Sequence, residues 1–285
     1  MHALLSLRAS LLVGIAAAAL WGAPTLACDK AALATKYPEL VGRIVRLAQD
    51  GESPPYTFRD ASNFEMMRGL DNDLAVATFA CLGMKTETKI GKWSGLLPAV
   101  IAGQADVMWN NLYYTPIRAQ QVDFVTYVLA STGALVKAGN SKKITSLTDT
   151  CGIKGVAGLG TVEEVLLRKT SDECVAAGKP ALEIATYPDK PSGMRLVQAG
   201  RADLMLTDGG FAGNVAKTNG AEFAQAFLIK TNHKVGPGIT RTFAGLQPAI
   251  VDALQQIQAD GTMKELMVKY GVDPSLMLPV EGFTQ

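Results

Sequence analysis

The chain has 285 residues, of which 48% are hydrophobic and 19% carry a charge, and its formal net charge is +1. Nucleic acids and anionic membrane surfaces are bound through an excess of positive charge. We therefore expect neither of them as a partner of this chain. Its length suits either one large domain or two lobes.

The first 27 residues have the pattern of a secretory signal peptide. Arg8 supplies the positive charge, residues 11–20 form an apolar run, and residues 25–27 are small enough to precede a cleavage site. A membrane-spanning helix would need about 20 apolar residues, and Pro24 ends this run too early. We therefore expect a periplasmic protein from which residues 1–27 are removed. Removal of Arg8 leaves 26 basic and 26 acidic side chains.

All four cysteines follow this cleavage site, at Cys28, Cys81, Cys151 and Cys174. An even number in an oxidising compartment favours disulfides over a metal site or a catalytic thiol. Three pairings are open, and the short separation favours Cys151–Cys174, which leaves Cys28–Cys81. Residues 25–28 also loosely resemble a lipoprotein cleavage site, so a lipid anchor on Cys28 is the less favoured alternative. With His233 as the only histidine after residue 27, no metal is expected.

Short apolar strands alternate with amphipathic helices along the chain, which is typical of an α/β fold with largely parallel sheets. In chain order, the pattern predicts strands at Ile44–Leu47, Asp106–Asn110, Thr132–Val136, Ile153–Val156, Leu182–Thr186, Leu204–Thr207 and Gly238–Thr242. Apolar residues at helical spacing predict helices over Leu70–Leu82 and Pro248–Asp260. The polar stretch Asn140–Lys143 is interpreted as a connection between lobes.

A weak internal repeat relates two distant segments. Residues 102–111 align without gaps on residues 199–208, and each copy runs from a helix end through a glycine to a strand followed by two polar residues. Gly103 and Gly200 fit the left-handed position that ends a helix. Either two ordinary turns share common residues, or two related lobes each present polar groups at the carboxyl end of a strand. Ligands of open α/β sheets bind at those ends, so two facing edges would form a cleft.

Four motifs occur in a defined order and spacing along the chain. They are Pro54–Phe58, Gly69–Leu74, Trp93–Pro98, and Asn110–Arg118 followed by Val122–Phe124. Together they resemble the extracellular solute-binding proteins of family 3, the polar amino-acid-binding components of bacterial ABC importers, from about Arg43 to the C-terminus.

The resemblance implies a two-lobed periplasmic-binding-protein fold. Each lobe would be a mostly parallel sheet flanked by helices, and a two-strand hinge would join the lobes. We place residues 28–137 and 234–285 in the first lobe and residues 138–233 in the second.

The resemblance also implies two charged ligand contacts, one on each lobe. Arg118 would bind the ligand's carboxylate, because a guanidinium offers two parallel donors. Asp208 would bind the ligand's ammonium group. The alternatives are a solvated surface arginine and a helix N-cap, the latter favoured by Gly209 and Gly210 beside Asp208.

Three further parts of the site are implied. Gly160 and Thr161 would bind an anion at a helix start, because Thr161 and Glu164 have the spacing of a capping box. An ordinary capped helix explains that spacing equally well. Trp93 and Tyr56 would pack near the ligand, although both aromatics could instead belong to the core.

Asn110, Asn111 and Tyr113 stand where the family mostly carries small residues. The contacts that normally complete the carboxylate site must therefore differ. Either Tyr113 donates its own hydroxyl or the pocket is reshaped for another ligand. The predicted ligand is accordingly a small amino acid or a similar zwitterion.

The preferred interpretation is a monomeric binding protein without a cofactor that delivers its ligand to an ABC permease. One alternative is an enzyme on the same scaffold, similar to the cyclohexadienyl dehydratases, for which Glu52 and Asp208 are the only obvious acid–base groups. The chain lacks a nucleophile–histidine pair and a metal motif, so no enzyme is expected. A second alternative is a ligand-sensing partner of a receptor.

Overall fold

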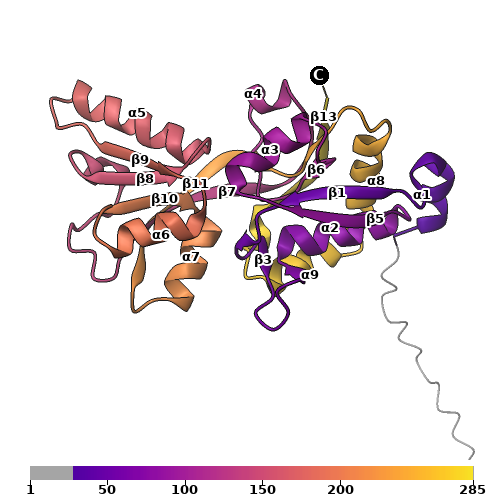
Figure 1. Cartoon of the computed structure of the whole chain (residues 1–285), viewed down its shortest axis with the longest axis horizontal. Helices are drawn as coiled ribbons and strands as arrows, with labels where there is room; N and C mark the ends of the chain where they lie inside the picture. Colours follow the sequence, from indigo (N-terminus) through magenta and orange to yellow (C-terminus); the bar gives the residue numbers. More distant parts are fainter. Residues whose placement is uncertain (1–27, 285) are drawn as a thin grey trace, which may run out of the picture.

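The computed structural model describes residues 28–284 and consists of two lobes (Figure 1). The first lobe combines the N-terminal half of the chain with its C-terminal segment. The second lobe is built from the middle of the chain, which gives the two-lobed α/β architecture that the sequence predicts. The predicted signal peptide lies outside the described residues. Within residues 28–284, no helix is long and apolar enough to cross a membrane.

The first lobe is a sheet covered by helices. Its strands are β1 (Ile44–Gln49), β5 (Lys85–Ile90), β6 (Val107–Met108), β12 (Gly238–Ile239) and β13 (Met277–Phe283). A small separate sheet contains β2 (Glu52–Ser53), β3 (Thr57–Arg59) and β4 (Met67–Arg68). The helices are α1 (Lys30–Lys36), α2 (Leu70–Cys81), α3 (Trp93–Ile101), α4 (Pro116–Ala119), α8 (Leu246–Ala259) and α9 (Thr262–Lys269).

The second lobe repeats this plan on a smaller scale. Its strands β8 (Lys154–Gly158), β9 (Glu183–Tyr187) and β10 (Leu204–Asp208) are parallel to one another. Its helices are α5 (Val162–Ala176), α6 (Lys190–Gln198) and α7 (Gly209–Thr218).

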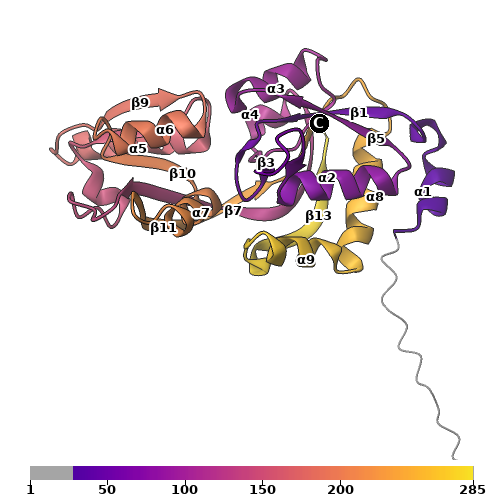
Figure 2. The ribbon, with the colours of Figure 1, turned by 60° about the horizontal axis from the view of Figure 1, so that its bottom comes forward.

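Two long strands run through both lobes, as Figure 2 shows for β7 (Asp123–Lys137). Near its start β7 pairs with β12 and β13, and from Thr132 to Leu135 it pairs with β10. The antiparallel strand β11 (Phe223–Val235) accompanies β7 from Lys137 back to Val128. All these strands therefore form one sheet, in the order β5-β1-β6-β12-β7-β10-β8-β9 with β11 and β13 also on β7.

The course of β7 corrects one sequence prediction. Asn140–Lys143 was expected to connect the lobes, but this stretch follows the part of β7 that already pairs with β10 and β11. It is a turn of the second lobe, so the prediction is wrong. The change of lobe takes place inside a strand that is buried along nearly its whole length, with no loop between the two parts. The predicted lobe boundaries, after residues 137 and 233, stay a prediction. The strand pairing favours boundaries that lie inside β7 and β11 instead.

The predicted helices form because their apolar residues face the core. In α2, Leu70, Leu74 and Cys81 are buried, and α8 buries Ile250 and Leu254 in the same cluster. The first-lobe core is continuous from α2 through the sheet to α8.

Both repeat glycines adopt the predicted conformation, with φ angles of 71° for Gly103 and 67° for Gly200. The predicted strand over Asp106–Asn110 is shorter than expected and forms only Val107–Met108. The chain turns directly after it, where Asn111 has a φ angle of 48°.

The two disulfides pair as the sequence predicts. Cys151–Cys174 joins the start of the second lobe to α5, with 5.6 Å between the Cα atoms. Cys28–Cys81 joins the segment just before α1 to α2, with a Cα separation of 5.9 Å. Because a lipid anchor would use the thiol of Cys28, this disulfide and lipidation exclude each other.

Candidate functional site

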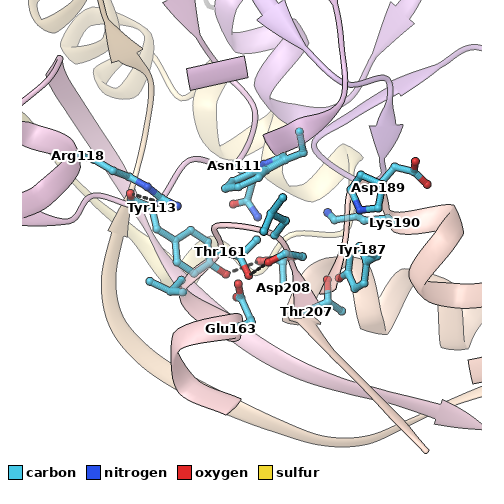
Figure 3. Close-up of a pocket in the computed structure, with 15 residues that line it drawn as sticks. Asn111, Tyr113, Arg118, Thr161, Glu163, Tyr187, Asp189, Lys190, Thr207 and Asp208 are labelled. Carbon is cyan, nitrogen blue, oxygen red and sulfur yellow. Dashed lines mark hydrogen bonds between the residues drawn. The ribbon is translucent and has the colours of Figure 1, made fainter. Parts of the chain in front are cut away.

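A cavity lies between the two lobes and is lined from both sides (Figure 3). Its volume is about 40 Å³, whereas pockets for small ligands have volumes of roughly 300–1,000 Å³. The lobes are therefore in contact across it. The lining residues are Trp93, Asn111, Tyr113, Arg118, Gly158, Leu159, Thr161, Val162, Glu163, Tyr187, Pro188, Asp189, Lys190, Thr207 and Asp208.

Asp208 is the acid to which both lobes contribute donors. It ends β10 and caps α7, where its Oδ1 accepts the backbone N–H of Phe211 at 2.9 Å. Its Oδ2 accepts the hydroxyl groups of Tyr56 at 3.3 Å and Tyr113 at 3.2 Å, both from the first lobe. Burial raises the pKa of both tyrosines well above the usual value, so their hydroxyls stay protonated and donate. Asp208 is therefore both the N-cap of α7 and an acceptor of hydrogen bonds from the other lobe.

Arg118 also bridges the lobes. It lies in the short helix α4, where Thr115 caps its backbone N–H. Its guanidinium donates to the carbonyl oxygen of Tyr113 at 2.8 Å and, across the cleft, to that of Gly160 at 2.9 Å. The ring of Trp93 lies 5.5 Å from the guanidinium carbon. Burial lowers the pKa of Arg118, but an arginine remains charged at neutral pH.

The start of α5 forms the second-lobe wall beside Arg118. Thr161 caps the helix by accepting the N–H of Glu164 at 3.2 Å, as predicted. A capping box would also have the Glu164 carboxylate accept the N–H of Thr161. In the structure it accepts the N–H of Gly160 instead, at 2.8 Å. Gly160, with a φ angle of 76°, tightens this turn enough to bring its N–H to Glu164.

The predicted aromatic and amide residues take different places. Trp93 lines the cavity, and its indole N–H donates to the Asn110 carbonyl at 3.3 Å. Asn110 is fully buried behind the cavity, where its Oδ1 accepts the N–H of Asp50 at 3.0 Å and the hydroxyl of Thr57 at 2.5 Å. Tyr56 reaches the site only through its hydroxyl. Asn111 and Tyr113 line the cavity directly.

A buried acid that the sequence analysis did not single out shapes this loop. Asp71, at the start of α2, accepts the backbone N–H of Asn111 and the hydroxyl of Tyr127, the latter at 2.6 Å. Tyr127 in turn accepts the indole N–H of Trp109 at 3.0 Å. Burial, partly opposed by these hydrogen bonds, raises the pKa of Asp71 from 3.8 to about 6. Asp71 thereby holds Asn111 in its left-handed conformation.

Three more charged residues at the cavity were missed from the sequence. Glu163 is 5% exposed, faces Thr132, and has its pKa raised by burial. Asp189 binds Lys92 of the first lobe at 2.9 Å. Lys190 begins α6 and lines the cavity. The sequence signal that could have identified this wall is the pair Asp189–Lys190, the N-cap and first residue of α6.

The comparison with known families decides the identity of this fold. The model of the bacterial extracellular solute-binding proteins, family 3, matches residues 45–273. The chain belongs to this family. The match includes both walls of the cavity, from the loop at Tyr56 to α7.

Individual relatives are similar over most of their length. The L-cystine-binding protein TcyJ of Escherichia coli K12 is 28% identical over 226 residues, which cover 79% of this chain and 81% of the relative. A solved structure of an ancestral arginine-binding protein bound to arginine is 28% identical, has a TM-score of 0.72, and covers 80% of this chain and 97% of that one. An ancestral amino acid-binding protein described as a precursor of cyclohexadienyl dehydratase is also 28% identical, with a TM-score of 0.70 and coverages of 84% and 99%.

We predict that Asp71 makes the stability of the protein depend on pH. Its pKa is higher in the folded state than the ordinary value of 3.8, so its stabilising contribution is complete below that value and is lost as the pH rises through 6. Asp71→Asn removes this titration. The free energy of unfolding of the wild type relative to the variant should therefore fall by about 2–3 kcal/mol between pH 4 and pH 7. Urea unfolding of both proteins at several pH values measures it, and a difference independent of pH would contradict the assignment.

Proposed function

We propose that the protein captures an amino acid between its lobes by binding the ligand's carboxylate at Arg118 and its ammonium group at Asp208. The observation that carries this proposal is the placement of the two opposite charges on opposite walls of one inter-lobe cavity. A zwitterion fits such a pair because each of its charges finds a counter-charge on a different lobe.

Arg118 is suited to this role because its present partners are weak competitors. Its guanidinium donates to two neutral backbone carbonyls, of Tyr113 and Gly160. A carboxylate can accept two parallel N–H groups of a guanidinium and carries an opposite charge, which a neutral carbonyl does not, so a ligand carboxylate can replace the carbonyls. The N–H groups of Gly160 and Thr161 already donate to Glu164 and to the carbonyl oxygen of Gly158, so the role of these two residues in ligand binding stays a prediction.

Closure follows from the same geometry. A ligand that contacts both lobes binds the closed state more tightly than the open one and shifts the population toward closure. Tyr56, Tyr113 and Lys92 reach across to acids of the second lobe. The 40 Å³ cavity must widen to admit a ligand, and β7 and β11 are the strands that would bend.

The cellular role follows from the family. We propose that the protein is exported to the periplasm, acts as a monomer and delivers its ligand to an ABC permease. The names of relatives mention cystine, arginine and histidine, which supports an amino acid as the ligand class. A receptor that senses the closed state would use the same site.

We do not propose catalysis. Of the two acid–base candidates in the sequence, Glu52 is outside the cavity lining and lies 3.7 Å from Lys92, while Asp208 accepts three hydrogen bonds from the protein. The dehydratase-related neighbour is itself described as an amino acid-binding protein.

The proposal predicts that Arg118→Ala loses about 2–5 kcal/mol of binding free energy, because the ligand carboxylate is left without its partner in a closed site. A thermal-shift screen of the proteinogenic amino acids and L-cystine first identifies the ligand, which at 100 times its Kd should add about 2.7 kcal/mol of stability. Isothermal titration calorimetry then compares wild type with the variant. Arg201→Ala, an exposed arginine of the second lobe, is the control and should bind as wild type. Unchanged affinity of Arg118→Ala would refute the carboxylate site.

Gly210 gives a second prediction, about closure itself. A Cβ atom at Gly210 would lie 2.5 Å from the hydroxyl oxygen of Tyr56 on the other lobe. Gly210→Ala should therefore weaken ligand binding by about 1–3 kcal/mol, the usual cost of overpacking, while the melting temperature without ligand does not fall. Gly213→Ala, one turn further along α7, meets only Gln225 at 3.6 Å and should bind normally. Equal affinities of the two variants would show that this closed contact plays no part in binding.

A further inference from the structure

Lys190 and Glu163 are the charged lining residues that the proposed function does not use, and Glu163 accepts a hydrogen bond from Thr132. Arg118 and Asp208 contact the ligand's two charges, and Asp189 is paired with Lys92. Within residues 28–284, the ammonium group of Lys190 makes no hydrogen bond or ion pair, although its side chain lines the cavity and is half-buried. A half-buried cation without a partner is unusual, because its transfer out of water is not compensated.

The position of Lys190 in its helix is also unfavourable. It is the first residue of α6, directly after the N-cap Asp189. The N-terminus of a helix carries partial positive charge, so a cation in the first turn is destabilising there. Residues that are unfavourable for their local secondary structure in this way are expected at functional sites.

The side chain of Lys190 nevertheless has a defined direction. Its ammonium lies over the ring of Phe211, 4.4 Å from the ring centre. This cation–π contact stabilises the charge. In the view of Figure 3, Lys190 extends into the cavity from the side opposite Arg118, with Asp208 and Glu163 between them. The cavity therefore has a cation at each end.

The charge of Lys190 acts on two nearby acids, Glu163 and Asp71, but neither carboxylate lies within ion-pair distance of its ammonium group. Glu163 faces Thr132, and Asp71 accepts hydrogen bonds from Tyr127 and Asn111. Their carboxylates are thus directed at protein donors. Once Arg118 and Asp208 bind the backbone groups of an amino acid, its side chain meets other lining residues, among them Trp93, Tyr187 and Lys190 and the acids Glu163 and Asp189.

We propose that Lys190 is a specificity-determining residue that selects amino acids whose side chain ends in an oxygen acceptor, an amide or a carboxylate, over those with a cationic side chain. This inference rests on the proposed function. An acceptor would give the ammonium of Lys190 the partner it lacks, whereas a lysine or arginine side chain would bring a second cation into a site with little water, where like charges repel strongly. The inference separates this chain from its arginine-bound structural neighbour.

Calorimetry with L-glutamine, L-glutamate, L-arginine and L-lysine on the mature protein tests the inference. Wild type should bind L-glutamine or L-glutamate at least about tenfold more tightly than either cationic amino acid. Lys190→Gln should remove most of this preference, and Lys190→Glu should reverse it. Lys85→Gln, an exposed lysine of β5 remote from the cavity, is the control and should keep the wild-type preference. Circular dichroism melting curves establish that each variant is folded.

Two results would overturn the inference while the proposed function stands. The first is wild-type protein that binds L-arginine or L-lysine as tightly as L-glutamine and loses both on Arg118→Ala. The second is an affinity ratio that stays the same in folded Lys190→Gln and Lys190→Glu. If wild type binds no amino acid in the calorimetric panel or the thermal-shift screen, the proposed function fails and the inference fails with it.

Discussion

The carboxylate of Asp208 is buried where the two lobes meet, and a buried charge is tolerated only when donors surround it. One donor comes from α7 of its own lobe and two, the hydroxyls of Tyr56 and Tyr113, come from the other lobe. Separation of the lobes removes two of these three donors and exposes the acid to water. The same carboxylate therefore links the local helix cap and the contact between lobes, and under the proposed function it also binds the ligand's ammonium group. Its geometry depends on β7 and β11, which keep the lobes in register.

Much of the architecture was predictable because it depends on local patterns. Helix α2 follows from its apolar spacing, and the left-handed glycines at 103 and 200 mark the ends of two helices. The paired arrangement of Arg118 and Asp208 on opposite lobes followed from the family motifs. The passage between lobes was not predictable, because β7 is one uninterrupted strand, buried along nearly its whole length, whose pairing partners change midway. Strand partners far apart in sequence determine that feature.

The site itself was predictable only in part. Residues in motifs were predicted, whereas Asp71, Glu163 and Lys190 were missed, since only the tertiary structure supplies the surroundings of each. Asp71 lies inside a recognised motif, but its hydrogen bond to Asn111 joins segments 40 residues apart. Glu163 looks like an ordinary residue of a capped first helical turn. The sequence shows Lys190 only as a cation at the start of a helix. Its position in the lining of the cavity is visible only in the structure.

Ligand-driven closure of two lobes is the central claim, and small-angle X-ray scattering tests it most directly. The radius of gyration of the mature protein is measured during a titration with the amino acid that binds most tightly. The account predicts a saturable decrease in the radius of gyration with the same midpoint as the calorimetric titration, because the ligand contacts at Arg118 and Asp208 join the lobes. A scattering curve that stays unchanged at calorimetric saturation would contradict it.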